Sequence, residues 1–482
     1  MNRAMVRFVT GRILFITGLL MFPSVVVALY YREGWAGVWP FLIPIAIALL
    51  LGTALSIRRP KKPDFFMREG LVVVGITWLS LSFLGSLPFV ISRSIPSMVD
   101  AFFEAASGFT TTGASVLSAP QELLHSQLFW RSFTHLIGGM GILVFALAVM
   151  PRIQSDDVFI MKAEVPGPVF GKLLSRVRGT ARVLYIMYLA MTAILTLLLV
   201  LGGMPLFDSL LHAFGTAGTG GFGIQANSVA YYTNPYIHYV IAFGMLAFGV
   251  NFNLYYALLY RRMKGAFKSE EFRWYIGFVA GALVLILLNT RNLYESFSQQ
   301  LREVFFTISS IMTTTGFTIN NYETWPLFSH VILLGLMMIG GMAGSTAGGL
   351  KVSRVALYIK SSFQEFRGSL NPNRRLPLRF EGKATGAELK TKVFQYLAIY
   401  ILLYVAFLLV VAADAGDFMT SFSVVAATFN NIGPGFGAVG PSRSYQELSD
   451  LSKVALSFAM IMGRLEIIPI IALLSPRTWR RT

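Results

Sequence analysis

The chain has 482 residues, of which 55% are hydrophobic and 13% are charged, and it carries a formal net charge of +17. A soluble domain has about 25% charged residues, so this composition excludes an ordinary soluble protein and predicts an integral membrane protein. There is no cysteine, which excludes disulfides, thiolate metal sites and cysteine nucleophiles. The histidines are scattered and form no His-x-x-x-His pair, which argues against a zinc enzyme.

The first apolar run extends from Ile13 to Tyr31 and follows three arginines. A signal peptide also has a basic start, but this run is too long and lacks a clear small-x-small cleavage site, so we expect a retained first helix. A helix needs about 20 apolar residues to cross a bilayer. Hydropathy and charge predict ten such helices, near residues 12–31, 38–57, 70–92, 128–150, 181–202, 234–260, 272–290, 325–359, 393–413 and 451–475.

Lysine and arginine gather in every second connection between these helices, around residues 58–62, 152–182, 261–268, 360–392 and 477–481. Basic loops face the cytoplasm, so we expect both termini to be cytoplasmic. The opposite loops hold mainly acids, which either raise the cation concentration at an outer mouth or are simply solvated loop charges. These acids are Glu104, Glu122, Asp208, Glu295, Glu303, Glu323, Asp417 and Glu447.

Four segments on the predicted outer side are too short to span and too apolar for solvent loops, near residues 98–112, 206–218, 301–314 and 418–430. They contain AFFEAASGFTTTGAS, LLHAFGTAGTGGFG, FFTISSIMTTTGFT and SVVAATFNNIGPGF. In each, an apolar half-helix leads into a polar stretch and then a glycine, namely Gly113, Gly220, Gly316 and Gly433. The pattern predicts an all-α membrane protein with four helix–pore loop–helix repeats around one pore, preceded by an extra N-terminal helix pair.

Non-helical backbone at membrane depth is tolerated only where protein buries it or where it lines a water-filled cavity. Glycine adopts left-handed backbone angles without a Cβ clash, and the half-helices would direct their partially negative C-terminal ends at the ion. These features favour a ring of carbonyl dipoles around a monovalent cation. A single such turn would be an ordinary helix end, so the inference depends on all four copies. The candidate ion-binding residues are Thr111, Thr112, Gly113, Thr219, Gly220, Thr314, Thr315, Gly316, Asn431, Ile432 and Gly433.

Several motifs resemble the Trk/Ktr/HKT superfamily of potassium transporters, and in particular its bacterial Trk-type membrane subunit. The most specific are IGGMAGSTAGGLKVSR at 339–354 and GRLE within MGRLEIIPII at 462–471. WRSFTHLIGGMGILVF at 130–145, AEVPGPVFGKL at 163–173 and NNIGPGFG at 430–437 agree with them. The likeness covers essentially the whole chain, and the helix pair before residue 60 resembles the Trk type rather than the shorter Ktr type.

The resemblance implies a homodimer in the bacterial inner membrane, with one pore per protomer conducting potassium inward. It also implies a cytosolic, TrkA-like ring of RCK-type regulatory subunits, on which alone a nucleotide (ATP/ADP or NAD/NADH) is expected. We expect potassium as the substrate, no covalently bound cofactor, contact with membrane lipid and none with nucleic acid. Plant relatives that transport sodium have serine at the position of Gly113, so glycine here favours potassium. The second and fourth filter sequences, AGTGGFG and FNNIGPG, depart from the others and make the ring chemically uneven.

The stretch GGMAGSTAGG, residues 340–349, is unusually rich in glycine for the middle of a predicted helix. Small-residue packing of the G-x-x-x-G type is one interpretation. The resemblance implies the other, a mobile intramembrane loop that gates the pore below the filter. The candidate gating residues are Gly340, Gly341, Gly344, Ser345, Thr346, Gly348, Gly349, Lys351 and Arg464.

Arg464 lies in the middle of the last predicted helix, where a charge is expensive unless it meets a partner or water. It either pairs with Glu466 or with helix-end carbonyls, or it forms a positive barrier at the pore beside the glycine-rich stretch. Lys351 either pairs with an acid or lies at the cytoplasmic vestibule.

We therefore expect potassium uptake without enzymatic activity. The alternatives are a sodium or mixed potassium/sodium permease, with or without ion coupling, and a broken-helix transporter of an organic solute, which would predict an inverted repeat. A membrane enzyme would need a convergent catalytic constellation that the spans lack. The expected units are an N-terminal pair at 1–62 and pore repeats at 63–160, 161–268, 269–384 with gating loop 340–349, and 385–482.

Overall fold

The computed structural model of the protein describes residues 1–58, 60, 66–141, 177–259, 268–370, 377–414 and 416–480. These residues are almost entirely helical, apart from a small antiparallel hairpin of β1 (Arg379–Phe380) and β2 (Lys383–Ala384). The predicted all-α class is therefore confirmed for the described part of the chain. The motif at 163–173 and the end of the predicted helix 128–150 lie outside the described residues.

The described helices can be grouped by the predicted units of one pair and four repeats. The pair is α1 (Arg3–Tyr30) and α2 (Gly34–Ser56). The first repeat has α3 (Met67–Ile91), α4 (Met98–Phe109) and α5 (His125–Gly139), and the second has α8 (Val177–Leu201), α9 (Leu206–Gly218), α10 (Pro235–Phe248) and α11 (Phe252–Leu259). The third has α13 (Glu270–Thr290), α14 (Phe297–Met312), α15 (Leu327–Ile339) and α16 (Val352–Leu370). The fourth has α17 (Ala387–Ala412), α18 (Phe418–Phe429), α19 (Asp450–Arg464) and α20 (Ile468–Leu474), before α21 (Pro476–Trp479).

Among the described residues, six helices are long and apolar enough to cross a membrane, and seven are if the bent pair α10–α11 forms one span. The six are α1, α2, α3, α8, α13 and α17. The structure thus indicates a multi-pass membrane protein. The criterion finds fewer than the ten predicted spans because the last predicted helix of the second, third and fourth repeats is divided into shorter pieces, and that of the first extends beyond the described residues.

Three predicted helices, 234–260, 325–359 and 451–475, are wrong as continuous elements. The chain bends by 91° between α10 and α11. Residues 340–351 separate α15 from α16, and residues 465–467 separate α19 from α20. Hydropathy averaged over a window does not detect such breaks. Glycines and small polar residues leave the average apolar even where the backbone leaves its helical hydrogen bonds and bonds to other parts of the protein.

The short helices α4, α9, α14 and α18 occupy the four positions predicted for half-helices. Side chains at their starts fix where they begin: Ser97 Oγ accepts from the Asp100 N–H at 3.3 Å, and Asp417 Oδ1 accepts from the Thr420 N–H at 2.8 Å. The four helices are tied into one bundle, since α4 packs against α5 and α19, α9 against α5 and α10, α14 against α10 and α15, and α18 against α15 and α19. Each short helix then gives way to a non-helical turn.

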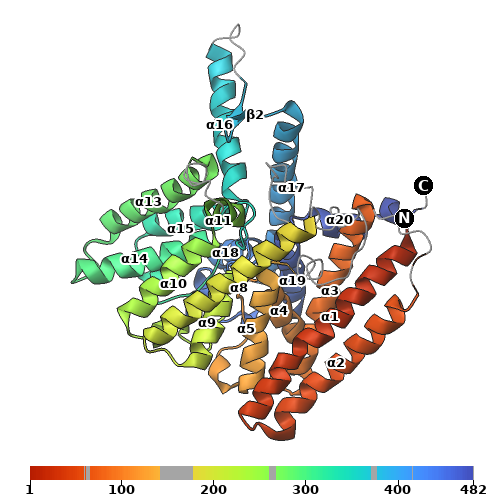
Figure 1. Cartoon of the computed structure of the whole chain (residues 1–482). Coiled ribbons are helices and arrows are strands. Elements are labelled where there is room, and N and C mark those ends of the chain that lie inside the picture. The colour runs from red at the N-terminus through yellow and green to blue at the C-terminus, as the bar shows by residue number, and fades with distance from the viewer. Residues whose placement is uncertain are drawn as a thin grey trace.

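Two further features describe the overall arrangement. Helices α16 and α17 project beyond the other helices, with the β1–β2 hairpin between them (Figure 1). The N- and C-termini lie close together (Figure 1), and the Arg68 guanidinium donates to the carbonyls of Arg477 and Thr478 at 2.5 and 2.7 Å.

Candidate ion-binding site

The same backbone turn follows each of the four short helices. A left-handed residue is followed two positions later by a glycine with positive φ. The pairs are Thr111 and Gly113 (54° and 80°), Thr219 and Gly221 (55° and 68°), Thr314 and Gly316 (57° and 86°), and Asn431 and Gly433 (57° and 100°). In every copy, the N–H of the residue between them donates a hydrogen bond to the carbonyl oxygen of the helix residue five positions earlier. The distances are 2.9 Å for Thr112 to Ser107, 2.8 Å for Gly220 to Gly215, 2.8 Å for Thr315 to Ser310 and 2.7 Å for Ile432 to Ala427. We call these residues, 111–113, 219–221, 314–316 and 431–433, the first to fourth turns.

This equivalence corrects the predicted register of the second turn. The glycine that matches Gly113, Gly316 and Gly433 is Gly221, whereas Gly220 matches Thr112. The prediction took the first glycine of AGTGGFG, but aligning Thr219 with Thr111 and Thr314 would have given Gly221. Gly220 has a different constraint, because a Cβ on it would lie 2.4 Å from His135 Nδ1.

The four turns form a closed ring. A Cβ on Gly113 would lie 2.0 Å from the carbonyl oxygen of Gly220, and one on Gly221 would lie 1.9 Å from that of Thr315. A Cβ on Gly316 would lie 1.9 Å from the Ile432 oxygen, and one on Gly433 would lie 2.7 Å from the Thr112 oxygen. Each turn thus contacts the next, and the fourth contacts the first. The four glycines leave room for four backbone carbonyls around one axis.

A cavity of about 120 Å³ opens onto this ring and is lined by Gly113, Gly221, Gly316 and Gly433. Its other lining residues are mostly small or polar and include Arg131 and Arg443. None of the eight acids expected on this side is among its lining residues. Several of these acids instead contact other residues of the protein. Glu104 forms an ion pair with Arg131, Asp208 accepts a hydrogen bond from Tyr232, and Glu323 accepts one from the Gly437 N–H. Their placement favours a structural role over attraction of cations.

The turns hold backbone strain that a simple connection would avoid. Thr111, Thr219 and Thr314 adopt left-handed angles although β-branched residues are genuine outliers there. A left-handed residue with a Cβ costs about 1–2 kcal/mol, and such strain clusters at functional sites. The threonines are nevertheless fully buried, as are Thr112, Thr315 and Asn431. Strain repeated in three of the four turns around one axis favours a functional site over simple connections.

Residues 340–351, here called the glycine loop, lie directly against two of the turns. The Gly348 N–H donates to Thr314 Oγ1 at 2.6 Å, and a Cβ on Gly348 would lie 2.3 Å from the Asn430 carbonyl oxygen. Gly340, Gly344, Gly349 and Lys351 all have positive φ, so the loop is not helical. The end of the loop packs against its beginning, because a Cβ on Gly340 would lie 2.2 Å from the Gly348 oxygen.

The second and third repeats hold the glycine loop by its backbone. The N–H groups of Ala343 and Ser353 both donate to Glu271 Oε1, at 2.7 and 3.1 Å. The Met342 N–H donates to the Gly249 oxygen at 3.0 Å, in the break between α10 and α11. Among the other predicted gating residues, Thr346 Oγ1 donates to the Phe248 oxygen at 3.2 Å, Ser345 Oγ bonds within the loop to Met342, and a Cβ on Gly341 would lie 2.5 Å from Ala347 Cβ.

Arg464, the last residue of α19, links the glycine loop to α5. Its guanidinium donates to the Thr346 oxygen of the loop at 2.5 Å, and to the Gly138 and Gly139 oxygens at 2.6 and 2.5 Å. The predicted contact with helix-end carbonyls is therefore confirmed, and so is its position beside the loop. The predicted pair with Glu466 is wrong, since Glu466 forms a two-pronged ion pair with Arg354 at 2.6 and 3.0 Å.

Lys351 is buried at the end of the glycine loop, 2% exposed. Its ammonium group donates to the carbonyls of Ala347 and Gly348 rather than to the acid that the sequence suggested. Lys351 therefore links the end of the glycine loop to two carbonyl groups within the same loop.

The chain matches the family model TrkH, described as cation transport protein, over residues 40–480. It is 36% identical to the Trk system potassium uptake protein TrkH of Salmonella typhimurium over 99% of both chains. It is 33% identical to the Trk system potassium uptake protein TrkG of Escherichia coli over 100% of both chains. Its structure matches the crystal structure of the potassium transporter TrkH from Vibrio parahaemolyticus with a TM-score of 0.88, at 32% identity over 100% of both chains. The chain belongs to the TrkH family of cation transport proteins.

Proposed function

We propose that the protein takes up potassium through the ring of the four turns. The observation that carries the proposal is the closed contact of each turn glycine with a carbonyl of the next turn. A ring of backbone carbonyls replaces the hydration shell of a monovalent cation, and no acid lines the cavity that leads to it. The names of the relatives as potassium uptake proteins support potassium as the cation.

The proposed ion-binding residues are Thr111, Thr112, Gly113, Thr219, Gly220, Gly221, Thr314, Thr315, Gly316, Asn431, Ile432 and Gly433. Their backbone supplies the oxygens, while several of their polar side chains bond within the protein. Thr110 and Thr112 share a hydrogen bond at 2.8 Å, Thr313 and Thr315 share one at 2.7 Å, and Asn431 Nδ2 donates to Thr112 Oγ1 at 2.9 Å. Such bonds hold the ring rigid without placing charge in it.

The glycine loop and Arg464 form the proposed gate on the other side of the ring from the cavity. The loop contacts the third and fourth turns, so an ion leaving the ring would meet it. Arg464 places a positive charge beside it. Passage would then require the loop and the arginine to separate.

The finer assembly is also proposed. The protein would be a homodimer in a bacterial inner membrane, with ten spans and both termini in the cytoplasm, divided at the predicted boundaries into 1–62, 63–160, 161–268, 269–384 and 385–482. A cytosolic ring of RCK-type subunits carrying the nucleotide would regulate the gate, in keeping with relatives named as parts of a Trk system.

Rubidium uptake into liposomes that contain the purified protein tests the proposal. With potassium trapped inside and removed outside, tracer rubidium should accumulate, and external potassium should inhibit it at far lower concentration than sodium. Equal inhibition by the two ions would favour the mixed permease. Uptake that ignores the potassium gradient would contradict the proposal.

Replacing Glu271 by alanine should raise uptake in the absence of a cytosolic partner. The change removes the bond from Ala343 of the glycine loop and the bond from Ser353 at the start of α16, and each bond to a charged group contributes about 1.5–3 kcal/mol. Glu271→Gln is the matched control, because its amide oxygen can still accept from both N–H groups. Uptake by Glu271→Ala equal to that of Glu271→Gln would show that these bonds do not restrain the gate.

A further inference from the structure

We propose that Arg131 and His135 of α5 are positioning residues for the second turn, and that they set the preference for potassium over sodium. This inference rests on the proposed function and deepens it. Neither residue belongs to a turn, and both lie on a helix of the first repeat. They are four residues apart and therefore share one face of that helix.

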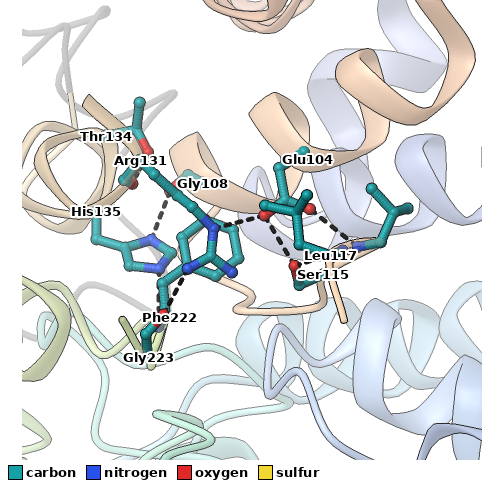
Figure 2. Close-up of polar contacts among 10 residues, drawn as sticks. Glu104, Gly108, Ser115, Leu117, Arg131, Thr134, His135, Phe222 and Gly223 are labelled. Atoms are coloured by element: carbon teal, nitrogen blue, oxygen red, sulfur yellow. Dashed lines mark hydrogen bonds and ion pairs between the residues drawn. The ribbon is translucent and has the colours of Figure 1, made fainter. Parts of the chain in front are cut away.

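Arg131 joins the first repeat to the chain that leaves the second turn (Figure 2). Its Nε donates to Glu104 Oε1 of α4 at 2.6 Å, and its Nη1 donates to the Gly223 oxygen at 2.7 Å. The guanidinium also stacks on the Phe222 ring, 3.6 Å from the ring centre. Arg131 and Glu104 are almost fully buried, at 3% and 1% exposure. A buried pair of this kind holds its geometry because any loss of contact leaves an unpaired charge.

Glu104 is itself fixed to the chain that leaves the first turn. Its carboxylate accepts from Ser115 Oγ at 2.9 Å and from the Val116 N–H at 3.0 Å. The ion pair therefore connects residues just after Gly113 with residues just after Gly221. One charge pair sets the relative position of two neighbouring turns.

His135 makes a second connection, between α4 of the first repeat and the chain that leaves the second turn (Figure 2). The Phe222 N–H donates to Nε2 at 3.3 Å, so Nε2 carries no proton and Nδ1 donates to the Gly108 oxygen at 2.8 Å. The ring also fills the space beside Gly220, where a Cβ would lie 2.4 Å from Nδ1. His135 is completely buried. It thus fixes the backbone on both sides of Gly221.

The second turn needs support from another repeat because its own helix cannot supply it. In the third segment Ser310 Oγ, on the short helix itself, donates to the Phe317 oxygen at 2.7 Å, one residue after Gly316. Gly215 occupies the matching position of the second segment, since both residues accept the five-residue bond of their turn. Gly215 has no side chain to donate, and a Cβ there would lie 2.8 Å from the Phe317 ring. The matching residue, Phe222, is held by Arg131 and His135 instead.

Selectivity among monovalent cations depends on where the carbonyl oxygens are held and how firmly. Without the contacts from α5, the second turn would adjust to a smaller ion more easily than the third turn, which has its own bond from Ser310. Weakening the contacts from α5 should therefore change the ratio of ions more than the rate of transport.

The test compares inhibition of rubidium uptake by potassium and by sodium in liposomes. Arg131→Lys keeps a charge for Glu104 but cannot reach the Gly223 oxygen at the same time, and it should lower the potassium-over-sodium ratio about tenfold while most of the uptake remains. His135→Asn loses the bond to Phe222 and should shift the ratio in the same direction. If Arg131→Lys does not yield folded protein, His135→Asn decides by the same measurement.

Arg354→Lys is the matched control. Arg354 is also buried, paired to a glutamate and stacked on a ring, with Tyr396 at 4.0 Å, but it touches none of the four turns. The potassium-over-sodium ratio of Arg354→Lys should stay at the wild-type value. The inference would be overturned if the Arg131 and His135 variants lose uptake only in proportion to a loss of folded protein and keep the wild-type potassium-over-sodium ratio. A wild-type protein without preference for potassium would instead overturn the proposed function.

Discussion

Replacing Gly316 by serine should remove most of the preference for potassium over sodium. Gly316 has φ +86°, and a Cβ on it would lie 1.9 Å from the Ile432 oxygen, where no real Cβ fits. The third turn must therefore shift away from the fourth, which opens the ring. A loss of discrimination of about tenfold or more corresponds to only about 1.4 kcal/mol, less than the strain of a left-handed residue and a clash together.

The measurement is the ratio of potassium to sodium needed to inhibit rubidium uptake by half. Gly335→Ser is the control, because Gly335 lies on α15 in the same repeat and a Cβ there meets nothing within 4 Å. It should keep the wild-type ratio. An unchanged ratio for Gly316→Ser, with normal uptake, would exclude Gly316 from the ion-binding ring.

Replacing Arg464 by alanine should raise uptake without any cytosolic partner, by about tenfold or more. The guanidinium joins the Thr346 oxygen of the glycine loop to the Gly138 and Gly139 oxygens of α5. Bonds to a charged group contribute about 1.5–3 kcal/mol each, so losing them frees the loop and also removes the positive charge beside it. Both effects act in the same direction.

Arg477→Ala provides the comparison, since Arg477 is an exposed arginine on α21. Tracer uptake per folded protein should be unchanged in that variant. A flat or reduced uptake for Arg464→Ala, with the protein still folded, would contradict the barrier role. Loss of the folded protein in Arg464→Ala alone would instead favour a purely structural link between α5 and the loop.

The positions of the four short helices could be predicted from the sequence because they depend on local patterns. Each half-helix combines a short apolar run with a polar end and a glycine, and four copies recur along the chain. The four short helices lie where they were expected, at 98–109, 206–218, 297–312 and 418–429. Even so, the sequence pattern predicts the second turn one residue early, since Gly220 and Gly221 are adjacent and only the backbone angles distinguish them.

The broken helices were harder to predict, because an apolar average does not show where a backbone leaves its helical bonds. The glycine-rich sequence at 340–349 indicated one break, yet those at 249–251 and 465–467 contain few such residues. At the latter, Glu466 and Ile467 have positive φ of 55° and 70°, which no propensity suggests for isoleucine. The pairing of Glu466 with Arg354 supplies a tertiary contact that offsets this cost.

Contacts between distant residues could not be predicted from one sequence. Arg131 and Gly223 are 92 positions apart, and Arg464 and Gly138 are 326 apart. Arg131 and His135 lie in the motif that carried part of the family resemblance, but nothing in their spacing shows that they hold a turn of the next repeat. Their role emerges only when Gly215 is compared with Ser310 in space.

We propose that one ion sits within the ring of the four turns, and anomalous diffraction from crystals of the protein grown in rubidium can locate it. We expect a rubidium peak enclosed by the carbonyl oxygens of Thr112, Gly220, Thr315 and Ile432, and its loss when potassium replaces rubidium during growth. Rubidium bound elsewhere in the protein, with the ring empty, would show that the four turns do not form the ion-binding site.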